Sequence, residues 1–300
     1  MRILVTGSTG LLGTNLMNRL KGHEVLGLSR KTGFDLRNKE VTKSVIEDFK
    51  PEVVYHLAAN AAEMRGQVSP IDMTERNLNI FLHVLVPSIN TGVKRFIYTS
   101  SVAVYGEAEV PYREDDIPKP KDIYGINKWA AEQMLVTLAR SRGMEYTIFR
   151  PHNIYGPYQD MSNPYKNVVA LFMRNIIEGK PITIYGEGKM RRAFSYVDDV
   201  VDVLSQAQSE AFKNQVFNVG SAIDYGIDDL LSMIETISGK TAIVDRKPAR
   251  PTEIYQFLPS HTKLSNVYEY HETPLSEGLQ KTWDFITMPK IKEEENEICI

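Results

Sequence analysis

The sequence predicts an α/β fold with a doubly wound parallel sheet, followed by a smaller mixed α/β region. Three observations support this prediction. Short runs rich in β-branched residues alternate with helix-length segments over the first half of the chain. A glycine-rich loop joins the first run to the first helical segment. The second half is broken into shorter elements by proline and glycine. Together these features are typical of a Rossmann-type sheet with crossover helices.

The elements expected in the first half follow one another in a regular order. The predicted strands are Ile3 to Thr6, Val25 to Leu28, Val53 to Leu57, Arg95 to Thr99 and Tyr146 to Phe149. The predicted crossover helices are Leu11 to Leu20, Lys39 to Phe49, Asp72 to Asn90 and Tyr124 to Ser141. Two of these helices are followed by Gly22 and Gly92, and glycine commonly ends a helix. Because each helix connects two strands, the sheet is expected to be parallel.

The domain organisation follows from a change in the sequence near Arg150, after which proline and glycine divide the chain into shorter elements. The 300 residues have room for one larger domain and a smaller companion. We expect the first domain at residues 1–155, the second mainly at 156–290, and a charged tail at 291–300. Val216 to Val219 is expected to be a buried strand that rejoins the first sheet with a nearby helix, so the domains need not be contiguous.

Charge and cysteine content exclude several classes of function. The chain carries 35 Lys plus Arg against 38 Asp plus Glu, a formal net charge of −3, which does not suggest a nucleic-acid or membrane surface. The N-terminal apolar run reaches Gly7 before it attains signal-peptide length, so we expect a cytoplasmic protein without a membrane partner. Cys299 is the single cysteine, which excludes an intrachain disulfide and a cysteine-ligated metal site. No metal site is expected.

The loop after the first strand predicts a dinucleotide site. It reads Thr6-Gly7-Ser8-Thr9-Gly10-Leu11-Leu12-Gly13, a Gly-x-x-Gly-x-x-Gly pattern that opens a helix. Such glycines permit a tight turn and a close approach of the backbone, so that the helix N-terminus can receive a pyrophosphate. Glycine is common in turns, and it is the strand before and the helix after that make this loop informative. The first domain is therefore expected to bind a dinucleotide, and the second to bind the substrate.

The end of the second strand bears on which dinucleotide binds. An acidic residue there would accept hydrogen bonds from the adenosine ribose, but this chain has Ser29 and Arg30. The missing acid and the arginine favour a 2′-phosphate and hence NADP. Alternatively, Arg30 only solvates the strand end or stacks on the adenine. The cofactor is therefore predicted to be NAD or NADP.

Tyr124 and Lys128 are the predicted catalytic pair. They lie four residues apart at the start of a predicted helix, which places them on one face about 6 Å apart along the axis. Lowering a tyrosine pKa from near 10 to about 7 requires ~4 kcal/mol of phenolate stabilisation, which an ammonium and a nicotinamide cation can supply. Ser101, just after the fourth strand, is expected to donate a hydroxyl to the same substrate oxygen.

These residues together resemble the extended short-chain dehydrogenase/reductases, over nearly the whole chain. The resemblance runs from the glycine loop through Asn77, Ser101, Tyr124 and Lys128. It also includes Asp35-Leu36, His56-Leu57-Ala58-Ala59 and Arg150-Pro151-His152-Asn153-Ile154-Tyr155-Gly156-Pro157. Within the family the chain is most similar to nucleotide-sugar epimerases of the UDP-glucose 4-epimerase type. Their strand after the active serine carries small or apolar residues, like Ser101-Val102-Ala103-Val104-Tyr105-Gly106 here.

The resemblance implies a set of site residues. Asp35 and Leu36 are expected to border the adenine, and Asn77 is expected to lie near the nicotinamide. The full cofactor set is Gly7, Thr9, Gly10, Leu11, Leu12, Gly13, Ser29, Arg30, Asp35, Leu36, Leu57, Ala58, Ala59, Asn77, Thr99, Tyr124, Lys128 and Pro151. The nucleotide diphosphate sugar is expected to contact Ser101, Tyr124, Asn153, Asn167, Val168, Arg192, Arg250 and Glu253. Arginine suits phosphate chemically, although without the resemblance Arg192 and Arg250 would be interpreted as surface charges.

The leading functional hypothesis is 4-epimerisation of a UDP-hexose through a transient 4-keto sugar, with NAD or NADP retained tightly. Related 4,6-dehydratases carry a Thr-Asp-Glu run after the active serine, and UDP-glucuronate decarboxylases carry a Glu. Val102 and Ala103 cannot transfer protons, which disfavours both reactions. A reductase of keto nucleotide sugars that uses NADPH is the alternative suggested by Ser29 and Arg30. A non-catalytic dinucleotide sensor is disfavoured, because Tyr124 and Lys128 are present.

Two further expectations concern assembly and the sugar. In the family, helices equivalent to Asp72 to Asn90 and Tyr124 to Ser141 pair across a two-fold axis, so a homodimer is expected. Phe257 is expected to narrow the pocket against an N-acetyl group. The sequence leaves the sugar and the nucleotide base open. It also assigns no role to Glu63-Met64-Arg65-Gly66.

Overall fold

A computed structural model describes most of the chain. The described residues are 1–61, 69–106, 108–161, 167–186, 188, 190–249 and 255–288. The segment Glu63 to Gly66, the residues Arg250 and Glu253, and the tail 291–300 with Cys299 lie outside them. The expectations that rest on those positions therefore stay predictions.

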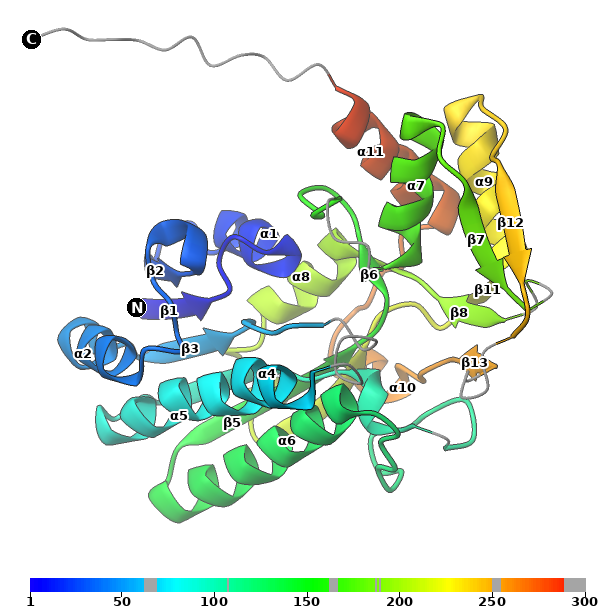
Figure 1. The fold of residues 1–300 in the computed structure, drawn as a ribbon. Helices are drawn as coiled ribbons and strands as arrows, with labels where there is room; N and C mark the ends of the chain where they lie inside the picture. The colour runs from blue at the N-terminus through cyan, green and yellow to red at the C-terminus, as the bar shows by residue number, and fades with distance from the viewer. Residues whose placement is uncertain are drawn as a thin grey trace, which may run out of the picture.

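A six-stranded parallel sheet forms the first part of the molecule (Figure 1). Its strand order is β10-β5-β4-β3-β1-β2, and every neighbouring pair is parallel. The strands are β1 (Arg2–Thr6), β2 (Glu24–Leu28), β3 (Val53–His56), β4 (Arg95–Thr99), β5 (Glu145–Pro151) and β10 (Gln215–Val219). The predicted doubly wound α/β fold is thereby confirmed. The order reverses between β1 and β3, and ligands of such sheets bind at this switch point.

Helices cover both faces of this sheet. On one face lie α2 (Lys39–Phe49), α5 (Ile80–Asn90) and α6 (Ile123–Arg142), and on the other lie α1 (Leu11–Arg19) and α8 (Val197–Ser205) (Figure 1). The short 3-10 helices are η1 (Arg30–Thr32), η3 (Val102–Val104) and η4 (Glu210–Phe212). The chain adds β2 on one side of β1 and β3 on the other side. Because crossovers between parallel strands are right-handed, connections that run in opposite directions along the sheet place their helices on opposite faces.

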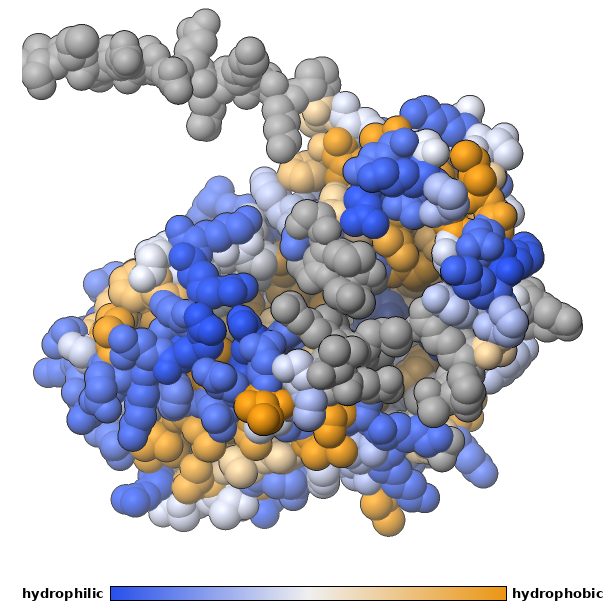
Figure 2. Space-filling model, viewed as in Figure 1, coloured by the Kyte–Doolittle hydropathy of each residue, from blue (hydrophilic) through white to orange (hydrophobic). Residues whose placement is uncertain are grey.

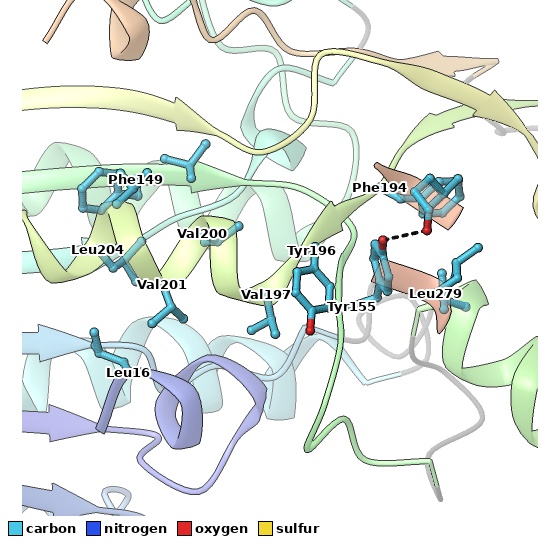
Figure 3. Packing of buried hydrophobic residues seen from close by; sticks show 14 of the residues in the cluster. Leu16, Phe149, Tyr155, Phe194, Tyr196, Val197, Val200, Val201, Leu204 and Leu279 are labelled. Atoms are coloured by element: carbon cyan, nitrogen blue, oxygen red, sulfur yellow. Dashed lines mark hydrogen bonds between the residues drawn. The ribbon is translucent and has the colours of Figure 1, made fainter. Parts of the chain in front are cut away.

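The strands alternate between two hydrophobic cores, as side chains of a strand must. Ile3, Val5 and Phe149 point to the core shared with α8, whereas Leu4 and Ile148 point to the core shared with α5 and α6. Figure 3 shows the first core, where the valines and Leu204 of α8 lie beside Leu16 of α1 and Phe149 of β5. The sheet is therefore buried on both faces, which explains its continuous apolar strands.

The predicted helix from Asp72 to Asn90 differs from expectation in its first turns. It begins at Pro70, and α4 (Pro70–Thr74) passes into a π-helical turn, η2 (Glu75–Asn79), before α5 continues to Asn90. Proline suits the first turn, where its missing N–H would have no partner in the helix. The π turn inserts an additional residue, and such turns are frequent near functional sites.

The second part of the molecule consists of small sheets and helices beside the carboxyl ends of the main sheet (Figure 1). It contains a three-stranded sheet in the order β11-β8-β13 and two two-stranded sheets, in which β12 pairs with β7 and β6 pairs with β9. The strands are β6 (Ile154–Tyr155), β7 (Ile182–Tyr185), β8 (Arg191–Ala193), β9 (Ser195–Tyr196), β11 (Asp224–Gly226), β12 (Val244–Lys247) and β13 (Gln256–Phe257). The helices are α7 (Val168–Glu178), α9 (Ile227–Ser238), α10 (Thr262–Ser265) and α11 (Leu275–Thr287).

Candidate active site

A large cleft runs along the carboxyl ends of the main-sheet strands and continues into the second part. Its volume is about 1710 Å³, above the range of roughly 300–1,000 Å³ for single small-ligand pockets, so it has room for two large ligands. Every predicted cofactor residue except Asn77 lines it: Gly7, Thr9, Gly10, Leu11, Leu12, Gly13, Ser29, Arg30, Asp35, Leu36, Leu57, Ala58, Ala59, Thr99, Tyr124, Lys128 and Pro151.

The glycine loop fits a pyrophosphate. Gly7 has φ of 72°, which favours glycine, and a Cβ there would lie 2.9 Å from the Cα of Ala58 on β3's loop. A Cβ on Gly13 would lie 2.1 Å from the carbonyl oxygen of Gly7. The N-cap of α1, Gly10, makes no side-chain hydrogen bond to the helix. The first turn of α1, Leu11 to Gly13, lines the cleft, so its N–H groups are available to an anion such as the pyrophosphate of a dinucleotide.

The end of β2 carries a neutral hydroxyl where an acid would bind ribose. Ser29 is buried, and its Oγ accepts from Thr9 Oγ1 at 3.0 Å and from the N–H of Thr32 at 3.2 Å. Asp35 is engaged by Arg37, and hydrogen bonds from this guanidinium lower the pKa of the carboxyl to about 2. Arg30 lies exposed at the rim of the cleft. This end of the cleft therefore presents cations around Ser29.

The start of α6 is shaped to bring Tyr124 to the cleft. Asp122 caps the helix by accepting from the N–H of Gly125 at 2.7 Å. A Cβ on Gly125 would lie 2.5 Å from the carbonyl oxygen of Ala103, so only glycine allows the helix to approach η3 this closely. Tyr124 packs against Ala103 and lines the cleft, and the residue is only 6% exposed.

Lys128 is buried beside two tyrosines. Its Nζ donates to the carbonyl oxygen of Thr99 at 2.7 Å and lies 4.8 Å from the ring centre of Tyr98 and 5.7 Å from that of Tyr124. Burial lowers the pKa of Lys128 to about 7, against the opposing charge of Glu132. Burial, followed by nearby negative charge, raises the pKa of Tyr98 well above its ordinary value. Tyr98 does not line the cleft, so Tyr124 is the one of these two tyrosines that is placed to meet a substrate.

Ser101 lies at the N-cap of η3 and lines the same cleft. Its Oγ accepts from the N–H of Ala103 at 3.2 Å. Because a hydroxyl can accept and donate at once, Ser101 can still donate to a substrate oxygen. The sequence-predicted trio of Tyr124, Lys128 and Ser101 thus converges at one end of the cleft.

Asn77 contacts the loop after β3, and its expected place near the nicotinamide stays a prediction. It is buried in the π-helical turn, where its Oδ1 accepts from the N–H of Asn60 at 2.8 Å and its Nδ2 donates to the carbonyl oxygen of Asn60 at 3.2 Å. Asn60 itself lines the cleft. Asn77 therefore fixes the loop after β3 and does not itself line the cleft, because its amide is engaged by Asn60 and by the sulfur of Met73.

The predicted substrate residues lie on the second part's side of the cleft, as far as they are described. Asn153 and Asn167 donate their amides to the carbonyl oxygens of Ala193 and Ile154, which holds β6 and the start of α7 in place. Val168 also lines the cleft. Arg192 lies 5.0 Å from the ring centre of Phe257, and its Nη1 donates to the carbonyl oxygen of Tyr255 at 3.0 Å.

Several cleft residues were missed by sequence reasoning. They are Arg76, His152, Tyr158, Gln159, Tyr185, Met190 and Ile227. His152 stands inside the Arg-Pro-His-Asn run that the sequence singled out, so that run was the available signal. The others come from loops, from β7, from the π-helical turn η2 and from the start of α9, where the sequence carries no motif. Among the described residues, no group of three or more histidine, cysteine or acidic side chains is arranged to hold a metal ion. In the same part of the chain, no helix has the length and apolar character needed to cross a bilayer.

Comparison with known proteins identifies the family. The model of the NAD dependent epimerase/dehydratase family matches residues 3–220. The UDP-glucose 4-epimerase of Mycolicibacterium smegmatis is 29% identical, covering 95% of this chain and 98% of its own length. The crystal structure of UDP-glucose 4-epimerase with UDP-glucose from Thermotoga maritima superposes with a TM-score of 0.90 at 31% identity, covering 95% and 98% of the two chains. A UDP-N-acetyl-alpha-D-glucosaminuronate decarboxylase of Bacillus cytotoxicus is 27% identical over 94% of this chain and 96% of its own. The chain therefore belongs to the NAD-dependent epimerase/dehydratase family, as the sequence motifs predicted.

Proposed function

We propose that this protein is a nucleotide-sugar 4-epimerase that interconverts UDP-hexoses through a transient 4-keto sugar. One observation carries the proposal. Tyr124 lies in the cleft beside Lys128 and Ser101, whereas the side chains that follow Ser101 are the apolar Val102 and Ala103. A site with one proton-transferring residue at the reacting carbon suits reversible oxidation of a hydroxyl, which needs no further acid or base.

The chain's own residues would act as follows. Tyr124 takes the proton of the sugar 4-hydroxyl at its phenolic oxygen and returns it when the ketone is reduced. The ammonium of Lys128 stabilises the phenolate, and Ser101 donates a hydrogen bond to the substrate oxygen. Bound NAD or NADP supplies the redox chemistry at the sugar carbon and is regenerated in each cycle. The α1 N-terminus, Thr9 and the loop at Ala58 would hold it.

Substrate affinity would come from the nucleotide diphosphate more than from the sugar. Asn153, Asn167, Val168 and Arg192 support this, since they line the cleft on the side away from the glycine loop. The relatives from Mycolicibacterium smegmatis and Thermotoga maritima are named for UDP-glucose. Binding through remote groups leaves the ring free to present either face, which epimerisation requires. A cytoplasmic location is part of this proposal.

A net reductase is the second candidate, and a specific observation favours it. Ser29 and the exposed Arg30 replace the acid that would bind the ribose of NAD, so the cleft suits a 2′-phosphate and NADPH. A reductase would consume NADPH stoichiometrically, whereas an epimerase returns its cofactor unchanged. The decarboxylase relative of Bacillus cytotoxicus represents a third reaction, which Ala103 supports less, because it brings no ionisable side chain to the sugar.

We also propose a homodimer built on α5 and α6. Ile71, Val86, Ile126 and Met134 on α4, α5 and α6 are 83%, 46%, 46% and 36% exposed. Figure 2 shows hydrophobic side chains gathered over this part of the surface. Apolar patches of this kind commonly mark interfaces, and two copies could pair these helices into a four-helix bundle. Sedimentation of the wild type and of an Ile126→Lys, Met134→Lys variant tests this: dissociation into monomers is expected.

The reaction is tested with UDP-glucose, UDP-N-acetylglucosamine and UDP-glucuronate. Each is incubated with the purified protein, without added cofactor and then with NAD or NADP, and the sugars are separated by chromatography. A C4 epimer without a net change of NAD(P)H absorbance is expected. Tyr124→Phe should abolish it. Stoichiometric oxidation of NADPH with a 4-keto sugar would instead establish the reductase.

A further inference from the structure

Glu132 is a buried carboxylate that the proposed reaction does not use. It lies one helical turn after Lys128 on α6 and is 1% exposed. A buried charge is unfavourable unless it is paired and hydrogen-bonded. Both oxygens of Glu132 are engaged: Oε1 accepts from Arg150 Nε at 3.0 Å, and Oε2 accepts from Arg150 Nη2 at 2.7 Å. Oε1 also accepts from Ser100 Oγ at 2.5 Å.

The contact with Ser100 joins Glu132 to the catalytic strand end. Ser100 lies between Thr99, whose carbonyl oxygen holds Lys128, and Ser101. Residues four apart on a helix share a face, so Lys128 and Glu132 contact neighbouring residues at the carboxyl end of β4. Two side chains of α6 therefore fix the backbone that carries Ser101, relative to the helix that carries Tyr124.

Arg150 is held so that Glu132 cannot easily move. Its Nη1 donates to the hydroxyl of Tyr105 at 2.8 Å, and this hydroxyl donates to Oδ1 of Asn218 on β10 at 2.7 Å. Arg150 and Glu132 have side chains only 3% and 2% exposed. Buried pairs of this kind are poor evidence for stability, because desolvation offsets the attraction between the charges. The role of the Arg150–Glu132 pair is therefore better explained by the fixed position that it gives to Glu132 than by a gain in stability.

We propose that Glu132 is a positioning residue of the active site. Through Ser100 it holds the strand end that carries Ser101, and its negative charge keeps the ammonium of Lys128 protonated beside Tyr124. The inference rests on the proposed function only in so far as conversion of a nucleotide sugar is the reaction used to measure kcat.

Of the groups that face Lys128, Glu132 carries the negative charge that counteracts the effect of burial on the Lys128 pKa. From β4 comes Tyr98, whose raised pKa keeps it neutral, and from β3 comes His56, whose pKa burial lowers to about 3. Tyr124 and Glu132 face Lys128 from α6 itself, and Arg150 of β5 lies behind Glu132. Removing the negative charge would make the ammonium of Lys128 easier to deprotonate.

Two substitutions separate the two roles. Glu132→Gln removes the charge and retains a side chain of the same shape, whereas Ser100→Ala removes the link to the strand and retains the charge. For Glu132→Gln we expect kcat to fall by about 10–100-fold with KM for the nucleotide sugar little changed, and the basic limb of the pH profile to move to lower pH. For Ser100→Ala we expect kcat to fall about tenfold without a shift of that limb. Glu132→Asp should recover the pH profile.

Glu145→Gln is the matched control. Glu145 accepts from Arg95 Nε and Nη2 at 3.0 and 2.7 Å, but at the amino end of β5, away from the cleft. If Glu132 were merely structural, both variants would lose thermal stability and bound cofactor alike, and kcat per bound cofactor would be unchanged in both. A kcat per bound cofactor that is unchanged in both variants, or that falls equally in both, would overturn the proposal.

A titration without substrate decides the role of the charge whatever the reaction proves to be. Lysine ¹³Cε resonances are followed against pH in labelled protein, and Lys128→Met assigns the signal of Lys128. We expect the pKa of Lys128 to fall by at least about half a pH unit in Glu132→Gln and to be unchanged in Ser100→Ala.

An unchanged titration in Glu132→Gln overturns the role of the charge, and wild-type kcat in Ser100→Ala overturns the role of the strand. Wild-type protein that converts no nucleotide sugar would refute the proposed function, and the titration would still decide. If Glu132→Gln does not fold, Ser100→Ala still tests the role of the strand, and Glu132→Asp, whose shorter side chain moves the carboxylate away from Lys128, tests the role of the charge by a smaller fall of the Lys128 pKa.

Discussion

The cofactor side and the substrate side of the cleft are built in different ways. On the cofactor side, several residues directly follow the carboxyl ends of strands of the main parallel sheet: Gly7 follows β1, Ser29 follows β2 and Leu57 follows β3. On the substrate side, Arg192 and Phe257 come from strands of three and two residues that pair in a separate small sheet. The sequence pattern of a regular strand predicts where the strand ends. The position of a very short strand depends instead on contacts with residues far along the chain.

This difference separates chemistry from recognition. The trio of Tyr124, Lys128 and Ser101 lies on α6 and β4's end, whose positions are fixed by a sheet buried on both faces. The residues that would select the sugar and the nucleotide lie on shorter elements that can change without disturbing that sheet. Relatives named as epimerase and as decarboxylase accordingly match almost the whole of this chain. Substitutions on the two sides should therefore act on different kinetic constants.

Replacing Tyr124 by phenylalanine should have the largest effect. The variant loses the group that transfers the proton, and kcat should fall by about 10³-fold with KM nearly unchanged. Tyr98→Phe is the matched control, because this ring also lies beside Lys128 but does not line the cleft. It is expected to retain wild-type kcat. Steady-state kinetics of both variants would contradict the assignment if Tyr98→Phe were the more impaired.

Lys128→Met should lose activity and gain stability at neutral pH. The folded-state pKa of Lys128, about 7, is below its ordinary value of 10.5. Between these values the unfolded chain binds the proton and the folded chain does not, so wild-type stability rises with pH through this window. Below pH 7 the full cost of burying the ammonium is present, on the order of a few kcal/mol. Urea unfolding at pH 6 and pH 10 should show the advantage of Lys128→Met shrinking as pH rises, and a constant difference would contradict the buried ammonium.

The same contrast explains how much could be predicted from the sequence. The alternation of strands and helices predicted the main sheet, and the boundaries of β4 and α2 agree with expectation residue by residue. Asn77 shows a limit: the motif singled it out, but the π-helical turn directs its amide to Asn60, and no periodicity forecasts that additional residue. Tyr185 and Met190 were missed because they reach the cleft from β7 and the loop before β8, which carry no local signal. Glu132 was missed because a carboxylate on a helix is ordinarily exposed, and its burial depends on Arg150 from another strand.

On the substrate side, Arg192→Ala should raise KM for the nucleotide sugar about tenfold and leave kcat nearly unchanged, because a charge-assisted contact to phosphate acts on binding in both ground and transition states. Arg191→Ala is the matched control. Its guanidinium pairs with Asp224 at 2.9 Å and does not line the cleft. Initial-rate kinetics that show equal changes in the two variants would indicate a general disturbance of β8 and contradict a phosphate contact by Arg192.

Ser29→Asp should have the smallest effect and lies on the cofactor side. An aspartate at the end of β2 can accept hydrogen bonds from the ribose hydroxyls of NAD and repels a 2′-phosphate, so the ratio of NAD to NADP affinity should rise by about fivefold to tenfold. Ser29→Asn separates charge from size, since it adds a side chain of the same shape without the carboxylate. The affinities for both dinucleotides are measured by calorimetry on protein freed of its cofactor. Equal ratios in the wild type and both variants would contradict a contact between the side chain at position 29 and the adenosine ribose.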